Sequence, residues 1–382
     1  MLKSIKYLLL TIATITNLYA TPVPVSAATS ATPVSRPYLM GFTRWPPDFT
    51  EEGLATMDRF IEKHADLVAV HLDNGIPWPE ALAGKPYSAD VEERLSYRPP
   101  QGKKLYVAVT PLNFGRDGLA AYWGAHDGMP LPAPWNTLPL NAPQVKKAYV
   151  NFLFHLVDKI HPDFLNIGIE ANLLIEKAPN KWTAYTDLHE YAYKRLKARY
   201  PHLPVFVSIE VLHLNGLADK ANKERQYKLV KNLMAYSDYF GMSLYPYMSW
   251  DVPSPMPDDF LDFAKEFGRP IVVAESGYSS KNVLVSLIPL FGSREKQAHF
   301  VSRLLEVGRR DRYVFIVNFA TTDFEKLIKK LPEYTLRQIA GIWKYTGLQT
   351  SSEKTKPALA IWDRYYRLPL ENKTDKNQKK VE

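Results

Sequence analysis

The sequence predicts an α/β fold, a single (β/α)8 TIM barrel with long loops at its C-terminal face. Eight short apolar runs, rich in β-branched residues, recur along the chain, and most precede a segment with helical periodicity. This alternation is typical of a parallel sheet, and eight such units in roughly 330 residues fit one barrel. Hydrophobic residues make up 46% of the 382-residue chain, which is enough for a large core.

An open, doubly wound sheet is the competing architecture. Such a sheet usually carries a glycine-rich phosphate-binding turn directly after its first strand. Here the first apolar run is followed by Arg44-Trp45-Pro46-Pro47, which cannot form that turn. The barrel is therefore the better interpretation.

The predicted elements follow from apolar periodicity and from residues that begin or end helices. Thr50 is expected to cap the first helix, and Pro201 marks the end of a later one. The predicted strands are residues 38–43, 67–72, 104–110, 163–169, 203–209, 238–244, 271–274 and 313–319. The predicted helices are residues 51–64, 142–160, 181–200, 221–236, 258–267, 294–310 and 356–366.

The N-terminal region has the pattern of a secretory signal, in which Lys3 and Lys6 precede a short apolar run and small residues. We expect a signal peptide over residues 1–20, or cleavage as late as residue 27, and then a flexible leader to residue 36. A barrel domain over residues 37–370 and a charged, disordered tail over 371–382 complete the predicted organisation. The mature protein is expected to be secreted or periplasmic, without an integral membrane segment.

Composition and motifs exclude several classes of function. The chain has no cysteine, which rules out disulfides and thiolate metal sites. Its net charge is +8, but the basic residues are mixed with acidic ones along the chain, so we expect no nucleic-acid partner. It has neither the paired histidines of a metalloprotease helix nor the Gly-x-Ser-x-Gly elbow of a serine hydrolase. We expect a monomer that needs no metal and no other cofactor.

The predicted strand ends bring many polar residues to one place, because the carboxyl ends of barrel strands converge on one mouth. These residues are Arg44, Asp73, Thr110, Glu170, Glu210, Tyr245, Glu275, Asn318 and Asp323. Two facing carboxyl groups suffice for glycoside hydrolysis, since one protonates the leaving oxygen and the other attacks the anomeric carbon or activates water. The ends of strands four and seven lie across the mouth, where carboxyl groups about 5 Å apart would suit a retaining mechanism.

Two motifs resemble those of a known enzyme group. Residues 238–246 (DYFGMSLYP) and 270–278 (PIVVAESGY) are similar to the strand-six and strand-seven motifs of endo-β-1,4-galactanases, within clan A of the glycoside hydrolases. The resemblance covers most of residues 38–370. It implies that Glu275 is the nucleophile and that Tyr245 hydrogen-bonds and orients it.

The same resemblance implies that Glu170, within residues 166–172 (NIGIEAN), is the acid/base. The clan usually carries an asparagine directly before this glutamate, where it contacts the sugar 2-hydroxyl. Here that place is taken by Ile169, and the nearest asparagine is Asn172. On strand eight, Asn318-Phe319 stands where a tryptophan is common.

Structural roles compete with each functional interpretation. Glu170 and Glu275 could be buried carboxylates paired with a basic residue, and Glu210 is a rival for the acid. Arg44, His71 and Asp73 could form an ion network beneath the site, and Trp78, Trp123 and Trp135 could pin a loop instead of stacking on sugar. The residues expected to bind substrate are Tyr245, Arg44, Asp73, Trp78, Asn172, Glu210 and Asn318.

The sequence thus predicts an exported retaining glycoside hydrolase that acts on a polysaccharide or oligosaccharide by double displacement. Glu170 and Glu275 are the expected catalytic residues. The alternative is a barrel derived from such an enzyme that binds glycan without cleaving it.

Overall fold

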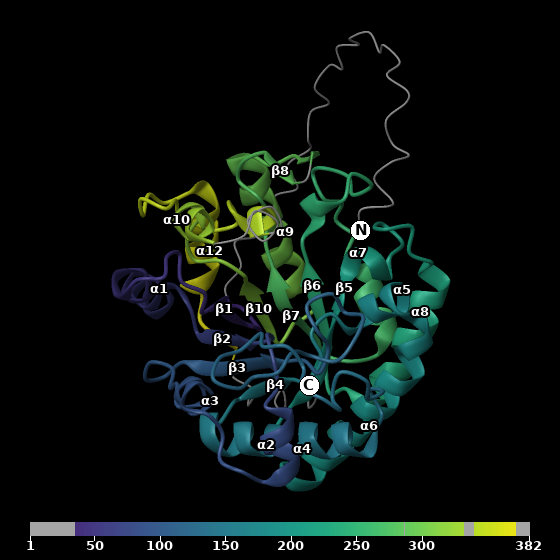
Figure 1. The fold of residues 1–382 in the computed structure, drawn as a ribbon. Coiled ribbons are helices and arrows are strands. Elements are labelled where there is room, and N and C mark those ends of the chain that lie inside the picture. Colours follow the sequence, from purple (N-terminus) through teal and green to yellow (C-terminus); the bar gives the residue numbers. More distant parts are fainter. Residues whose placement is uncertain (1–34, 286, 332–339, 372–382) are drawn as a thin grey trace, which may run out of the picture. The chain divides into compact units, whose positions relative to one another are not determined.

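The computed structural model describes residues 35–285, 287–331 and 340–371, and its centre is a closed barrel of eight parallel strands (Figure 1). Around the barrel the strand order is β1-β10-β7-β6-β5-β4-β3-β2. The strands are β1 (Leu39–Thr43), β2 (Leu67–Leu72), β3 (Lys104–Val109), β4 (Phe164–Asn166), β5 (Val205–Glu210), β6 (Phe240–Leu244), β7 (Ile271–Ser276) and β10 (Phe315–Asn318). The predicted TIM barrel is confirmed.

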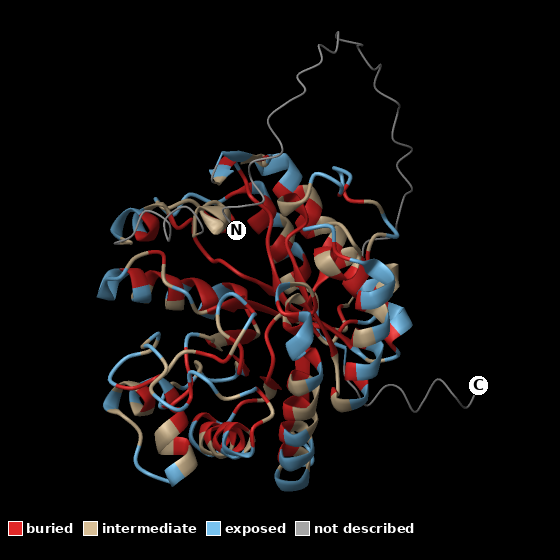
Figure 2. Ribbon diagram, turned by 45° about the vertical axis from the view of Figure 1, so that its right-hand side comes forward, coloured by how far each residue is buried: buried red, intermediate tan, exposed pale blue. Residues whose placement is uncertain are grey.

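Helices surround the barrel and bury their inner faces against it, as the red inner and pale blue outer helix surfaces in Figure 2 show. Thr50 caps the first helix as predicted, with its side chain accepting a hydrogen bond from the Gly53 amide at 3.1 Å. The helices are α1 (Glu51–His64), α2 (Trp78–Ala83), α3 (Ala89–Leu95), α4 (Pro143–Ile160), α5 (Leu174–Lys177), α6 (Trp182–Arg199), α7 (Val211–Leu214), α8 (Lys223–Leu233), α9 (Arg294–Arg310), α10 (Glu325–Lys330) and α12 (Pro357–Tyr366).

Alternation of side chains along the strands divides the core into two parts. One set of residues packs between the strands and the helices, and the other fills the barrel itself. The interior set is Leu67, Ala69, Tyr106, Ala108, Ile169, Phe206, Val272, Ala274, Phe315 and Val317. The interior is therefore a packed apolar floor, and polar residues further along the same strand faces lie above it at the mouth.

Two predicted elements differ most from the structure, and several short elements were not predicted. The fourth strand ends at Asn166, because the side chain of Asn166 accepts the Gly168 amide at 2.9 Å and the chain then turns at Glu170. The helix predicted over 258–267 is only the 3-10 helix η6 (Asp262–Phe267), which follows a proline-rich stretch. The short helices α2, α3, α5, α7 and α10 and the hairpin of β8 (Val283–Val285) and β9 (Ile288–Leu290) were not predicted.

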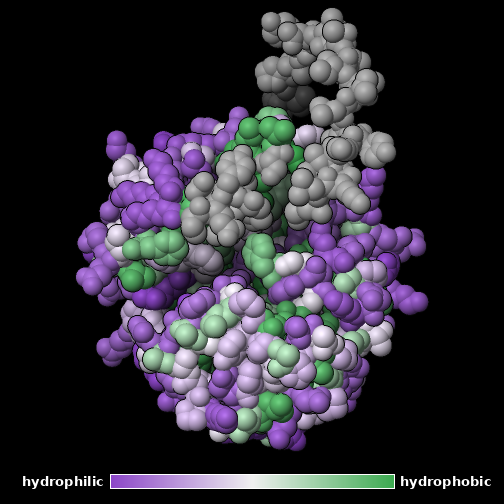
Figure 3. All heavy atoms as spheres, in the orientation of Figure 1, coloured by the Kyte–Doolittle hydropathy of each residue, from purple (hydrophilic) through white to green (hydrophobic). Residues whose placement is uncertain are grey.

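The predicted signal peptide, most of the leader and nearly all of the C-terminal tail lie outside the described residues. Within the described part of the chain, no helix has the length and apolar character needed to cross a membrane. The face drawn in Figure 3 is largely hydrophilic, with smaller hydrophobic areas between the hydrophilic ones. Exposed apolar residues include Leu284, Leu287 and Ile288 of the β8–β9 hairpin.

A fully buried ion pair ties the loops that follow the last strands. Lys356, just before α12, lies 2.6 Å from Asp323, and neither side chain is exposed. The ammonium group also donates to Ser280 Oγ at 2.8 Å and to the Gly347 carbonyl at 2.6 Å. Burial raises the pKa of Asp323 to about 6 and lowers that of Lys356 to about 8, although each charge stabilises the other.

We predict that Lys356→Met destabilises the protein, because it leaves the Asp323 carboxylate buried without its cation. The expected loss is about 3 kcal/mol in the free energy of unfolding. Urea denaturation of the variant and of wild type measures the difference. The exposed Lys354 provides a matched control, since Lys354→Met should change stability by less than about 0.5 kcal/mol. Equal midpoints for Lys356→Met and wild type would contradict a structural role for the pair.

Candidate active site

Glu275 reaches the mouth through an irregularity in β7. Ala274 belongs to the apolar interior, so regular alternation would turn the next side chain, Glu275, away from it. The pairing with β6 shifts here, because Met242 pairs with Val273 and Ser243 with Glu275. Ala274 is thus the extra residue of a β-bulge, and such bulges re-aim side chains beside active sites.

Glu170 follows β4 in a strained conformation. Its backbone is left-handed, with φ 49° and ψ 42°, a region that residues other than glycine adopt at a cost in energy. The Glu170 amide donates to Ser208 Oγ at 3.1 Å, so a side chain of β5 takes the role of a backbone acceptor. In this conformation the Glu170 carboxyl group reaches Ser243 of β6.

Two side chains at the end of β6 donate hydrogen bonds to the carboxyl groups of Glu170 and Glu275. Ser243 and Tyr245 are two residues apart at the end of β6 and therefore point to the same side of the sheet. Ser243 Oγ donates to Glu170 Oε1 at 2.8 Å, and Tyr245 Oη donates to Glu275 Oε2 at 3.0 Å. The two glutamates that the sequence singled out are thereby brought together at the mouth.

Burial raises the cost of ionising both carboxyl groups. Burial, and then the negative charge of Glu170, raise the pKa of Glu275 to about 8, although the Tyr245 hydrogen bond acts in the opposite direction. The pKa of Glu170 is raised chiefly by its burial. Both shifts favour the protonated form of the carboxyl groups, which is the form that an acid catalyst needs.

Arg116 supplies the positive charge of the site. It is buried in the loop after β3, and its Nη2 lies 3.5 Å from Glu170 Oε2. Its charge lowers the pKa of both Glu170 and Glu275. The positive charge of Arg116 therefore offsets part of the increase in pKa that burial causes in Glu170 and Glu275.

His71 and Asp73 are near Glu275. His71 Nδ1 lies 3.7 Å from Glu275 Oε1, and burial lowers the pKa of His71 to about 4, so the ring is neutral at physiological pH. The charge of Asp73 raises the pKa of Glu275. A neutral imidazole in this place adds polarity beside the carboxyl group without neutralising it.

Glu210, the other candidate for the catalytic acid, already has hydrogen-bond partners on both carboxylate oxygens. Its carboxylate accepts the amides of Leu212 and His213 and lies 2.5 Å from His213 Nδ1. Burial alone would lower the pKa of His213, but Asp219 and Glu210 outweigh burial and raise it to about 9. Glu210 therefore caps α7 and pairs with a protonated histidine.

The expectation that Asn172 binds substrate needs correction. Asn172 is fully buried, and its amide oxygen accepts the Glu210 amide at 2.7 Å. Its Nδ2 donates to the Glu210 carbonyl at 3.0 Å and to Gln226 at 3.1 Å. It joins the loop that carries Glu170 to the end of β5, and so it is a structural residue.

Arg44 and Asn318, which were also expected to bind substrate, have partners within the protein instead. Each follows an interior residue, Thr43 or Val317, so strand alternation turns both side chains toward the helices. Arg44 makes two hydrogen bonds with Asp58 of α1, at 3.0 and 2.9 Å. The Asn318 side chain donates to the Ala320 carbonyl at 2.8 Å.

The tryptophans of the first loops belong to the core. Trp78 has no exposed surface, its indole nitrogen donates to the Ala120 carbonyl at 2.9 Å, and its ring stacks on Trp135. Trp123 is buried and donates to Asp90. Trp78 is therefore not a substrate platform, because α2 packs its side chain inward.

Two residues of the site, Ser243 and Arg116, were not predicted. Ser243 lies inside a recognised motif, two residues before Tyr245, and strand alternation was the signal that could have placed it beside that tyrosine. Arg116 lies in a long loop whose path the sequence does not fix. Among the described residues, no group of three or more His, Cys, Asp or Glu side chains is arranged to hold a metal ion.

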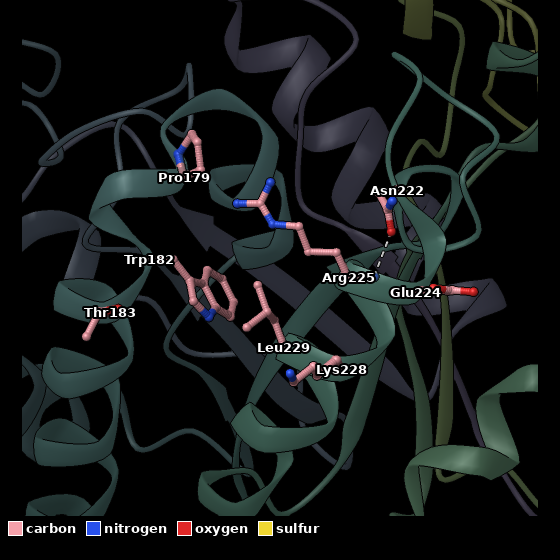
Figure 4. Close-up of a pocket in the computed structure, with 8 residues that line it drawn as sticks. All are labelled: Pro179, Trp182, Thr183, Asn222, Glu224, Arg225, Lys228 and Leu229. Atoms are coloured by element: carbon pink, nitrogen blue, oxygen red, sulfur yellow. Dashed lines mark hydrogen bonds between the residues drawn. The ribbon is translucent and has the colours of Figure 1, made fainter.

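A separate surface pocket lies between the start of α6 and α8 (Figure 4). Arg225 extends across it toward Pro179 and Trp182, and the backbone of Arg225 donates to Asn222 at 2.9 Å. None of the strand-end carboxylates lines this pocket. It therefore has no part in the candidate site.

A closed parallel barrel with a buried Glu275 and a half-buried Glu170 at the carboxyl ends of its strands is the arrangement expected of a barrel glycoside hydrolase. Residues 125–284 match the family model described as "Glycosyl hydrolase family 53", and this segment contains Glu170, Tyr245 and Glu275. The chain is thus a glycoside hydrolase, and the resemblance to clan A predicted from its motifs is confirmed.

Solved structures share the fold at low sequence identity. The "Ignisphaera aggregans GH53 catalytic domain" is 17% identical with a TM-score of 0.54, covering 92% of this chain and all of that one. An exo-β-1,4-mannosidase from Opitutaceae bacterium strain TAV5 is 14% identical with a TM-score of 0.59, covering 87% of this chain and 60% of that one. A GH10 endoxylanase from a sugarcane soil metagenome is 13% identical with a TM-score of 0.57, covering 85% and 96%. No curated protein matches the chain.

We predict that Arg116→Met raises the pKa of both site carboxyl groups, because it removes the positive charge that favours their ionised forms. Both titration midpoints are expected to move to higher pH. Carboxyl ¹³C chemical shifts of glutamate-labelled protein, followed against pH, measure the change. Arg116→Lys retains the charge and should give a smaller increase. Unchanged titration of the Met variant would show that the guanidinium does not act on the pair.

Proposed function

We propose that the protein is an exported retaining glycoside hydrolase that cleaves a polysaccharide or oligosaccharide by double displacement. Glu275 attacks the anomeric carbon, while Glu170 protonates the leaving oxygen and afterwards activates the water. The observation that carries the proposal is that Ser243 and Tyr245, two residues apart at the end of β6, donate to Glu170 and to Glu275. Export rests on the signal-like pattern of residues 1–20.

The charges around the pair support this division of roles. Tyr245 donates to Glu275, which favours the ionised carboxylate that a nucleophile needs. A proton on Glu170 is then available for the leaving group. In the second half of the reaction Glu170 must be ionised to act as a base, and the nearby Arg116 favours that state.

The pH dependence of this mechanism follows from the proton on Glu170. The active form holds one proton on the pair, so activity should decline at high pH as that last proton is lost. With the pKa of Glu275 raised to about 8, the alkaline limb should lie near that pH. On the acid side, activity should fall once both carboxyl groups are protonated.

We predict that Glu275→Gln lowers hydrolysis by at least about a thousandfold, because the amide cannot attack the anomeric carbon. Reducing-end assays on a panel of β-linked polysaccharides, with wild type and variant side by side, measure the loss. Glu62→Gln, an exposed change on α1, is the matched control and should retain full activity.

If wild type cleaves a glycan and the Glu275→Gln variant cleaves it equally well, the assignment of the nucleophile is wrong. A second candidate function is glycan binding without turnover. Ile169 favours it, because this side chain is packed into the barrel interior and presents no donor to a sugar. Glycan binding with no product from any substrate would support that alternative.

A further inference from the structure

A tryptophan from a distant segment lies beside the candidate nucleophile. Trp343 ends the 3-10 helix η7 (Gly341–Trp343) and is half-buried. Its ring centroid lies 6.3 Å from that of Tyr245, with the ring planes at 76°. Tyr245 in turn donates to Glu275. The ring of Trp343 is thus one residue removed from the reacting carboxyl group.

Trp343 is part of a longer aromatic surface. Its ring lies 6.0 Å from that of Phe319, which follows β10, and Phe319 lies 5.9 Å from Trp45, which follows β1. Strand alternation directs Phe319 and Trp45 toward the same side as the interior residues Val317 and Thr43. We call Trp45, Phe319 and Trp343 the aromatic wall. Trp45 is 37% exposed, so the wall is open to solvent at that end.

The segment that carries Trp343 is fixed from several sides. Tyr247 Oη donates to the Ile342 carbonyl at 2.9 Å, and the Phe324 amide donates to the Lys344 carbonyl at 2.9 Å. The Ser280 amide donates to the Tyr345 carbonyl at 3.0 Å, and Lys356 donates to the Gly347 carbonyl at 2.6 Å. Residues after β6, β7 and β10 and the residue before α12 therefore hold this segment in place. Binding residues on such supported elements are pre-organised.

The indole nitrogen of Trp343 is an unsatisfied hydrogen-bond donor. It is buried and has no hydrogen-bond partner among the described residues. A buried donor without an acceptor is costly, and in native structures such a group calls for an explanation. An acceptor oxygen of a ligand bound beside this ring would satisfy it.

We propose that the aromatic wall binds a neutral pyranose unit of the glycan next to the scissile bond, with Trp343 Nε1 donating to a sugar hydroxyl. This inference rests on the proposed function. Aromatic faces suit the apolar C–H faces of a sugar ring. Asp73, Glu170 and Glu275 place negative charge at the same mouth, which disfavours an acidic sugar.

Binding to the inactive Glu275→Gln protein tests the inference without turnover. The probes are the β-1,4-linked tetrasaccharides of galactose, mannose and xylose, with trigalacturonic acid as the acidic probe, measured by titration calorimetry. In this background, Trp343→Ala should weaken binding of the neutral probe about tenfold or more. Trp343→Phe keeps a ring but lacks the N–H and should lose less. Melting temperatures verify that each variant is folded.

Tyr191 of α6 is exposed to the same extent as Trp45, so Tyr191→Ala is the matched control and should leave binding unchanged. Three results would overturn the inference: equal affinity in the folded Trp343→Ala and Trp343→Phe variants, binding of the acidic probe alone, or binding of no probe. Hydrolysis by wild type is assayed separately. Wall-dependent binding without product would leave this inference standing and refute the proposed function, whereas product with wall-independent binding would do the reverse.

Discussion

Burial of the Glu170 and Glu275 carboxyl groups near each other at the mouth is the constraint on which the rest of the site depends. Two carboxylates cannot both be charged cheaply when they are buried next to each other. Burial, and then the negative charge of Glu170, raise the pKa of Glu275, and a carboxyl group that keeps its proton is what an acid catalyst needs. Every other polar residue of the mouth either holds these two groups in position or adjusts their charge.

The barrel creates this burial through its packing. The apolar floor under the site excludes water from one side of the carboxyl groups, and Ile169 is part of that floor. A low local dielectric strengthens both the repulsion and the hydrogen bonds from Ser243 and Tyr245. The strained backbone of Glu170 and the bulge at Ala274 are local costs, and the barrel's many regular contacts compensate for them.

Two positive charges near the mouth pair with different carboxyl groups. Arg116 acts on both catalytic candidates, while the protonated His213 is paired with Glu210 at the neighbouring strand end. Glu210 therefore differs from Glu170 in its environment, although Glu210 ends one barrel strand and Glu170 follows the neighbouring one. The environment, more than the residue type, separates a structural carboxylate from a reactive one.

The fold was largely predictable from the sequence, because buried parallel strands and amphipathic helices leave strong patterns. Helices α1 and α9 begin and end where predicted. The glutamates at two strand ends were also predictable, since chain order alone brings strand ends to one mouth. Which side of the sheet a side chain faces depends on register, and for this reason Arg44 and Asn318 were misplaced.

The remaining site residues depend on tertiary structure. A bulge such as that at Ala274 is invisible in an apolar run. Arg116 and Trp343 reach the mouth from long connections whose paths are set by contacts far away in sequence. Trp78 shows the opposite error, since a tryptophan in a predicted loop begins a short helix and is packed in the core.

The central claim is that Glu275 forms a covalent bond with the sugar. A 2-deoxy-2-fluoro glycoside with a good leaving group slows the second step more than the first and should trap the glycosyl-enzyme. Mass spectrometry of peptides from the treated protein should then find the sugar on Glu275, with no labelling of the Glu275→Gln variant. Labelling of Glu170 or Glu210 instead, or hydrolysis with inverted anomeric configuration, would contradict the account.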